Sequence, residues 1–145
     1  MRQHSSSGFE LHPRLKADTW SMGESPSSLL LLMNNALAPW LILVPKTDVH
    51  ELHHLSPGFR QDVREEVDLL CAALERALRP HKLNVATLGN LVPQLHIHVV
   101  ARYSNDVFWP GPVWGHQERR HYQAEEIERL RERLHGDLSE RFELL

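Results

Sequence analysis

The stretch that most constrains the fold is residues 94–100, which reads Gln-Leu-His-Ile-His-Val-Val and alternates polar with apolar side chains. Successive side chains of a β-strand point to opposite faces of a sheet, so a period of two is typical of a half-buried strand. Gln94, His96 and His98 then line one face, and the Leu, Ile and Val between them face a core. We predict a strand over residues 94–103.

A polar row of one amide and two imidazoles is an unusual way to build a solvent-facing strand, because Lys, Thr or Glu would serve that purpose better. It suits a site that presents ring nitrogens to a metal or a phosphate. Metal ligation needs a third ligand, but apolar residues follow His98, and the next polar side chain is the cationic Arg102. Neutral imidazole is a good nucleophile toward phosphorus, and a second imidazole can stabilise the charge that develops. Phosphate chemistry is therefore favoured, and metal binding stays open because other histidines could approach.

Hydrophobic periodicity predicts the elements around this strand. Apolar residues spaced by three and four predict one helix over residues 57–79 and a second over about 123–144. Two strongly apolar runs separated by Asn34-Asn35 and closed by Pro-Lys predict a hairpin of buried strands. The remaining predicted strands are a short edge strand at residues 9–15, an extended piece at 19–22, and a strand at 82–88 that a Gly89-Asn90 turn joins to residues 94–103. Together these elements predict an α+β fold, an antiparallel sheet of about five strands with two main helices.

The 145 residues fit a single domain, in which residues 1–8 are expected to be disordered and residues 104–145 to form a C-terminal extension with a Trp-rich loop and a helix. The net charge of −3 argues against a nucleic-acid surface. Cys71 is the single cysteine, so no intrachain disulfide can form and a cytoplasmic location is expected. The apolar run at residues 29–44 is short and interrupted by Asn and Pro, so we expect no membrane segment.

The sequence Pro93-Gln-Leu-His-Ile-His-Val-Val100 resembles the signature of the histidine triad (HIT) family, His-φ-His-φ-His-φ-φ with φ apolar, and carries Gln94 at the first histidine position. Upstream, Leu-Ile-Leu-Val-Pro-Lys at residues 41–46 is similar to the family's strand that ends in Pro-Lys. Asn84 and the Gly89-Asn90 pair are similar to its Asn and Gly-Gln positions. The predicted helix over residues 57–79 stands between these blocks, as it does in the family.

The resemblance implies a nucleotidyl hydrolase or transferase that cleaves at the α-phosphate of a dinucleoside polyphosphate or nucleoside phosphoramidate. It implies that His96 forms the covalent nucleotidyl intermediate and that His98 contacts phosphate. Asn84 and Asn90 match residues that hold ribose and phosphate, and Asn34 lies near the position of a ribose-binding acid. The family works without a metal in its chemical step and without a cofactor, and it often forms a homodimer, which we expect here with a small nucleotide as substrate.

Three departures from the family pattern affect the leaving-group chemistry. Gln94 cannot act as an acid, Leu91 stands where many members have a Ser, and Asp48 stands where a His often follows Pro-Lys. A nucleotide-binding protein with little or no turnover is therefore the alternative function, and a His-x-His metal-binding protein is a third.

Two further features complete the expectations from sequence. Lys46, at the end of a strand, is predicted to be solvated. Trp109 and Trp114 fit either stacking on a base or an interface, or a rigid packed loop.

Overall fold

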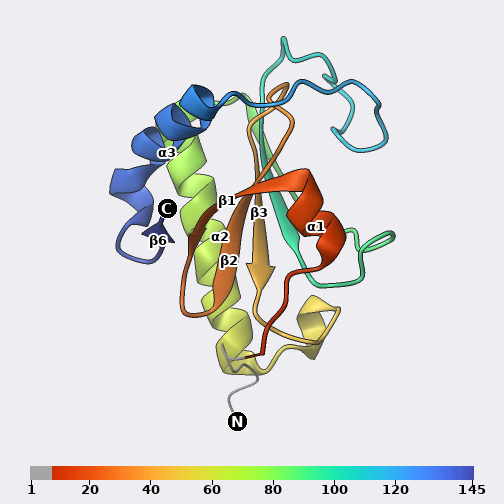
Figure 1. Cartoon of the computed structure of the whole chain (residues 1–145), viewed down its shortest axis with the longest axis vertical. Helices are drawn as coiled ribbons and strands as arrows, with labels where there is room; N and C mark the ends of the chain where they lie inside the picture. Colours follow the sequence, from red (N-terminus) through yellow and green to blue (C-terminus); the bar gives the residue numbers. More distant parts are fainter. Residues whose placement is uncertain (1–7) are drawn as a thin grey trace.

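The computed structural model describes residues 8–145, so most of the stretch expected to be disordered lies outside the described residues. The described chain forms a six-stranded antiparallel sheet in the order β4-β5-β3-β2-β1-β6 (Figure 1). The prediction of an α+β fold with an antiparallel sheet is confirmed. The sixth strand, the short β6, had no counterpart among the predicted elements.

The predicted hairpin is present as β2 (Ser28–Met33) and β3 (Trp40–Pro45), preceded by β1 (Thr19–Glu24). All six residues of β3 are buried, because this strand lies inside the sheet between β2 and β5 and is covered on both faces. Uniformly apolar sequence is what such a doubly covered strand requires.

The strands that carry the histidine motif are β4 (Lys82–Ala86), at the outer edge of the sheet, and β5 (Ile97–Arg102). The prediction that the motif strand spans residues 94–103 is wrong at its start. Pairing with β3 begins at Ile97 and pairing with β4 begins at His98, so Gln94 and His96 belong to the preceding loop.

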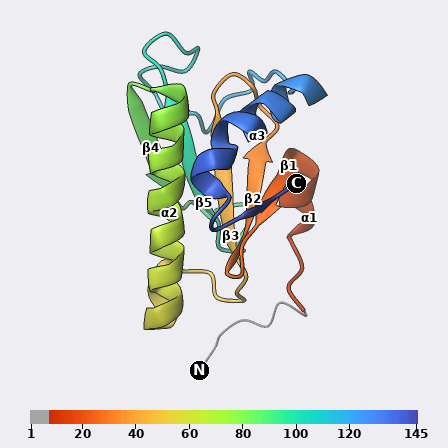
Figure 2. The same ribbon diagram turned by 90° about the vertical axis from the view of Figure 1, so that its left-hand side faces the viewer.

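The two main helices pack on one face of the sheet, and a short helix lies on the other (Figure 2). The first main helix is α2 (Pro57–Leu78), as predicted, with Pro in its first turn. A 3-10 turn, η1 (Leu52–His54), precedes it. The second main helix, α3 (Ala124–Leu138), buries one stripe of its surface against α2 and the sheet.

The predicted helix over residues 123–144 is wrong at its end, because α3 stops at Leu138 and the chain returns to the sheet as β6 (Glu143–Leu144). This strand pairs with β1 at Gly23. A Cβ at Gly23 would lie 2.7 Å from the Glu143 carbonyl oxygen, so the pairing requires glycine there. Phe142, which continues the apolar stripe in sequence, is buried by this return rather than by a helix.

The predicted edge strand at residues 9–15 is also wrong, because the chain forms the helix α1 (Pro13–Asp18). This helix lies on the sheet face opposite α2 and α3, which we call the open face. Pro13 occupies the first turn, where a missing N–H is harmless. The His12 ring caps the helix by accepting a hydrogen bond from the Arg14 backbone N–H. Apolar alternation with Pro13 suggested a strand, but the helix start at His12-Pro13 prevails.

Lys46 is buried, which contradicts its predicted solvation. Its ammonium group forms an ion pair with Glu24 at 2.7 Å and donates to the Ser25 carbonyl oxygen. These contacts tie the end of β3 to the turn between β1 and β2, so Lys46 has a structural role.

Candidate active site

The sheet has one face packed by helices and one face that carries the candidate site. Ile97 and Val99 of β5 point into the core under α2 and α3. His98, between them, points to the opposite face, in a row that crosses the sheet through Ile42 and Leu31 to Ser21. The strand period thus places His98 on the face away from the main helices.

His96 lies just before β5 and is 7% exposed. Its Nδ1 lies 2.6 Å from the backbone carbonyl oxygen of Gln94. A carbonyl oxygen can only accept, so Nδ1 carries the proton and Nε2 keeps its lone pair. Burial lowers the pKa of His96, outweighing the Gln94 carbonyl, which raises it, and the charge of His12 lowers it further. His96 is therefore a neutral imidazole with a free Nε2 at pH 7.

His98 has the opposite tautomer. The indole N–H of Trp40 donates to its Nδ1 at 2.9 Å, so Nδ1 is unprotonated and the ring proton sits on Nε2. The ring is 4% exposed and packs edge-on against both Trp40 and Trp114. Burial, with a smaller effect from the charge of His96, lowers the pKa of His98 to about 3. His98 is thus a neutral hydrogen-bond donor through Nε2.

The two rings form a complementary pair, with centroids 4.9 Å apart and planes at 68°. The Nε2 of His96 offers a lone pair, and the Nε2 of His98 offers an N–H. A phosphate has an electrophilic phosphorus and anionic oxygens, so it can use both groups at once. A main-chain carbonyl and an indole N–H set this arrangement, and no charged partner is needed.

Gln94 does not extend the row of ring nitrogens. Its side chain turns toward the N-terminal segment, where Oε1 accepts from the His12 backbone N–H and Nε2 donates to the Glu10 carbonyl oxygen, both at 2.8 Å. The prediction that Gln94, His96 and His98 share one strand face is therefore wrong: Gln94 turns away, and His96 precedes the strand, although its ring packs on His98. The Gln94 amide is occupied by backbone groups.

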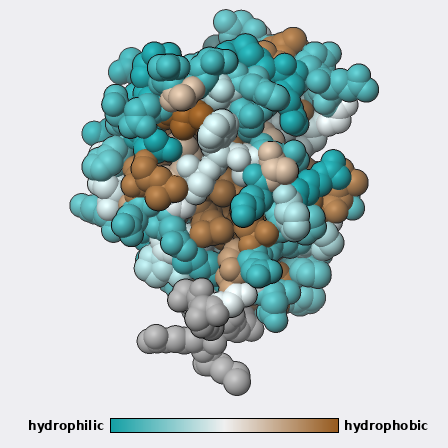
Figure 3. Space-filling model, in the orientation of Figure 1, coloured by the Kyte–Doolittle hydropathy of each residue, from teal (hydrophilic) through white to brown (hydrophobic). Residues whose placement is uncertain are grey.

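Two cavities lie near the histidines and the N-terminal segment that Gln94 contacts. A polar one of about 140 Å³ is lined by His96, Gln94, His50, Glu51 and the loop after β4. A larger one of about 620 Å³ lies between α1, the segment before it, and strands β1 and β2, with Leu29 and Leu31 in its lining. Figure 3 shows hydrophobic surface in the middle of this face, between α1 and the β1–β2 hairpin.

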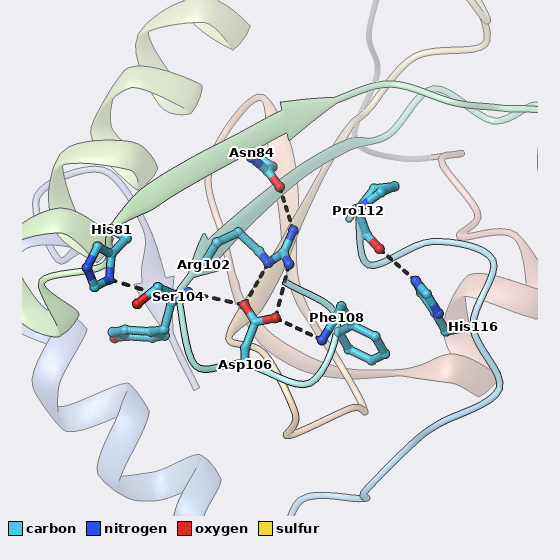
Figure 4. A network of polar contacts seen from close by, with 9 residues as sticks. His81, Asn84, Arg102, Ser104, Asp106, Phe108, Pro112 and His116 are labelled. Atoms are coloured by element: carbon cyan, nitrogen blue, oxygen red, sulfur yellow. Dashed lines mark hydrogen bonds and ion pairs between the residues drawn. The ribbon is translucent and has the colours of Figure 1, made fainter. Parts of the chain in front are cut away.

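Asn84 lies on the same sheet face as His98, one pair further along β4, but its carboxamide oxygen accepts from the Arg102 guanidinium at 2.9 Å (Figure 4). Arg102 is 2% exposed and also forms two hydrogen bonds with Asp106. Burial raises the pKa of the Asp106 carboxyl, but the Arg102 guanidinium and the backbone N–H groups of Tyr103 and Phe108 together lower it more, so the pKa lies below its usual value. This cluster holds the turn that follows β5 against β4.

The other two predicted amides lie apart from each other. Asn90 is exposed in the loop between β4 and β5, next to Gly89, whose φ of 70° favours glycine. Asn34 is half-buried after β2, where its carboxamide oxygen accepts from the Tyr122 backbone N–H. The structure therefore brings His96 and His98 together and leaves Asn84 in the middle of β4, bonded to Arg102. Asn90 lies in the loop after β4, and Asn34 lies against the chain that leads into α3.

The two tryptophans of the C-terminal loop have different neighbours. Trp114 packs on Trp40 and His98. Trp109, which is 37% exposed, lies over the guanidinium of Arg102. Both therefore belong to the packed loop, and Trp114 also forms part of the wall around His98.

Among residues 8–145, no group of three or more His, Cys, Asp or Glu side chains is arranged to hold a metal ion. Within the same residues no helix is long and apolar enough to cross a membrane.

The chain matches the sequence profile of the HIT domain over residues 14–105. The chain belongs to the HIT family. A histidine triad protein from Marinobacter aquaeolei VT8 is 41% identical, with a TM-score of 0.87 and coverage of 91% of this chain and 97% of that one. One from Bradyrhizobium japonicum is 38% identical, with a TM-score of 0.86 over 89% and 97%. A HIT protein from Sinorhizobium meliloti is 37% identical, with a TM-score of 0.89 over 92% and 100%. Among curated proteins, none matches the chain.

Sequence reasoning missed two parts of this HIT site. Trp40 begins the second apolar run of the predicted hairpin, and a buried indole N–H there needs a partner, which the pattern alone does not identify. The segment before α1 was counted as an edge strand, although His12-Pro13 is a helix start that would have turned the chain onto the open face. Trp40 contacts His98 across 58 residues of sequence, and His12 contacts Gln94 across 82, so neither contact follows from local pattern.

Proposed function

We propose that this HIT protein is a nucleotidyl hydrolase or transferase that cleaves at the α-phosphate of a dinucleoside polyphosphate or a nucleoside phosphoramidate. His96 Nε2 attacks phosphorus, the bond to the leaving group breaks, and a nucleotidyl-His96 intermediate forms. Water then attacks the same phosphorus and releases nucleoside monophosphate with the free imidazole. The observation that carries the proposal is the pair of fixed, neutral tautomers at His96 and His98.

His98 supports both steps through its Nε2–H. In the transition state for either attack, negative charge grows on the non-bridging oxygens, and a preoriented donor in a buried setting stabilises that charge. Because Trp40 occupies Nδ1, the proton of His98 is confined to the nitrogen that can face a ligand. Its pKa of about 3 means that it donates this hydrogen bond as a neutral group at pH 7.

The cavities support a nucleotide as ligand. Leu31, in the lining of the larger cavity, is two strands from His98 in the same row, which at the usual strand spacing is about 10 Å. This separation suits a nucleoside in the cavity whose 5′-phosphate reaches the histidines. The volume of about 620 Å³ lies within the range of small-molecule sites. The smaller polar cavity beside His96 suits the phosphate and the leaving group.

The test is an intact-mass measurement on protein quenched in denaturant at alkaline pH during turnover of diadenosine polyphosphates and adenosine phosphoramidate, because a phosphohistidine bond is labile in acid. We expect an adduct of one adenosine monophosphate on His96. His96→Gly should show no adduct, and His121→Ala, which alters an exposed histidine, should match the wild type. An adduct on another residue would contradict the mechanism, as would turnover by His96→Gly at the wild-type rate.

A nucleotide-binding protein with little turnover is the second candidate, and the amide of Gln94 favours it. This side chain cannot act as an acid toward a leaving group, and its oxygen and one of its N–H groups bond to the backbone of His12 and Glu10. Tight binding of adenosine monophosphate by calorimetry, without adduct or product over hours, would establish this alternative.

The homodimer expected from the family resemblance stays a prediction. It is supported by β4, the outer edge strand, which exposes Val85 at 48% and is followed by Leu88 at 44%. Sedimentation equilibrium would test it.

A further inference from the structure

Gln94 connects two segments that lie far apart in the sequence. Its side-chain amide bonds to Glu10 and His12, which are 84 and 82 residues earlier. One bond uses the oxygen and the other uses the nitrogen, so the amide is matched to this pair of backbone groups. The two bonds flank Leu11, and residues 10–12 are thereby fastened to the loop that carries His96.

The fastened segment forms a wall of the larger cavity. Glu10 and Leu11 line that cavity together with Pro13 and Lys16 of α1. Gln94 itself lines the smaller cavity, beside His96. Gln94 therefore stands between the two cavities, with its carbonyl oxygen on the nucleophile and its side chain on the segment.

We propose that Gln94 is a positioning residue for substrate binding, which holds residues 10–12 in place as a wall of the nucleoside site. This inference rests on the proposed function. The amide neither donates nor accepts a proton in the reaction. Its main-chain carbonyl orients His96, and its side chain closes the cavity over the nucleoside, so one residue aligns the nucleophile with the bound substrate.

The first test replaces the amide. Gln94→Met has nearly the same length and neither the donor nor the acceptor, and it leaves the Gln94 carbonyl oxygen on His96. We expect KM for the nucleotide substrate, and Kd for adenosine monophosphate, to rise about tenfold, with kcat within about threefold of the wild type. Gln61→Met, which removes an exposed helical amide bonded to Glu65, is the matched control and should change neither constant.

The second test removes the same contact from the other side. His12 has φ of −52°, an angle that proline adopts, so His12→Pro is compatible with the local backbone. The substitution deletes the backbone N–H that donates to Gln94 Oε1. His12→Ala loses the same ring and keeps the N–H. We expect His12→Pro to raise KM several-fold above His12→Ala. In combination with Gln94→Met, this difference between the two variants should vanish, because the acceptor is already absent.

Hydrogen exchange reports the contact independently of activity. The His12 amide should be protected in the wild type and should exchange at least about tenfold faster in Gln94→Met. If Gln94→Met does not fold, the comparison of His12→Pro with His12→Ala decides the question.

The outcomes separate the two proposals. A wild-type protein that neither binds adenosine monophosphate nor turns over any substrate contradicts the proposed function. A wild-type protein that binds nucleotide, with Gln94→Met unchanged in Kd and KM or lowered in kcat alone, overturns the positioning role. Equal exchange of the His12 amide in both proteins would also overturn it.

Discussion

The two faces of the sheet show how one strand serves stability on one side and chemistry on the other. The face under α2 and α3 is an almost continuous apolar core, in which Leu41, Leu43 and Val99 have no exposed surface. Its buried charge, Glu66, is satisfied by Ser28 and Arg141. The opposite face has apolar residues too, but it interrupts them with His98, two cavities and the Gln94 contact.

The difference is that the helical face excludes ligands, whereas the open face leaves polar groups at defined places with hydrogen-bonding capacity to spare. The Nε2 atoms of His96 and His98 are the clearest instance, since the hydrogen bonds of both rings to residues 8–145 are made by Nδ1. Substitutions on the two faces should therefore have separable effects, on stability on one side and on catalysis on the other.

The largest expected effect is on the open face, at His96, the proposed nucleophile. His96→Gly should lower kcat/KM by more than about 10³-fold, because the proposed covalent step has no substitute. The melting temperature should fall by only a few degrees, since His96 lies outside both apolar core clusters. Steady-state kinetics with the substrate panel and thermal unfolding measure the two effects. A residual rate within tenfold of the wild type would contradict the assignment.

The reverse pattern is expected on the helical face. Leu134 of α3 is fully buried, and Leu134→Ala should lower the free energy of unfolding by about 2–5 kcal/mol. Below the melting transition, kcat and KM should be unchanged. Urea unfolding and kinetics at 15 °C test this, with Leu145→Ala, at a residue 66% exposed, as the control. A selective loss of kcat without loss of stability would show that the two faces are not separable.

Asn84 lies on the open face, and its substitution tests whether a residue of that face can serve stability alone. Asn84→Ala leaves the buried Arg102 guanidinium without one acceptor, so the free energy of unfolding should fall by about 1–3 kcal/mol. Asn84→Asp keeps that acceptor and should restore most of the stability, with KM for nucleotide within twofold. If Asn84→Asp instead raises KM tenfold at full stability, the side-chain nitrogen binds substrate, as the family resemblance implies.

Trp40 sharpens the comparison, because it is a core residue that also sets a tautomer. Trp40→Phe keeps an aromatic ring but removes the N–H, so His98 can place its proton on Nδ1. If the misplaced proton weakens transition-state stabilisation by about 1 kcal/mol, the worth of one hydrogen bond, kcat falls roughly five- to tenfold. KM should change less than kcat. An unchanged kcat would show that the tautomer of His98 does not matter.

The pH dependence is the smallest effect. A protonated imidazole has no lone pair, so the rate of adduct formation falls as pH drops through the pKa of His96. Since burial lowers that pKa below 6.5, the acid limb should have its midpoint below pH 6.5. Quench-flow with a dinucleoside polyphosphate between pH 4.5 and 8 measures this midpoint. A midpoint at or above 6.5 would contradict a buried, neutral nucleophile.

The parts of the fold that local pattern decides were predictable. The stripe of α2 and the apolar hairpin β2–β3 follow from periodicity alone, and the resemblance adds their order around the motif. The parts decided by contacts distant in sequence were not. The start of β5 depends on where its neighbours end, and β6 depends on a glycine in β1. The burial of Lys46 depends on a turn that includes Ser25, 21 residues earlier.

The same division applies to the candidate site. Alternation in residues 94–100 was enough to find His96 and His98, because the residue types and the motif are local. It could not give their tautomers, since these depend on a carbonyl two residues away and on the indole of Trp40. It also misplaced Gln94, because the predicted strand set its side chain on the same face as His96 and His98, whereas the amide bonds to a segment near the start of the chain.

The most direct test of the central claim, two neutral imidazoles with opposite tautomers, is a long-range ¹H–¹⁵N correlation spectrum of the histidine side chains at pH 7, assigned with His96→Gly and His98→Asn. The expected spectrum shows His96 protonated on Nδ1 only and His98 protonated on Nε2 only. Loss of the His98 pattern in Trp40→Phe would confirm the cause. A cationic ring at either position, or the same tautomer at both, would contradict the account.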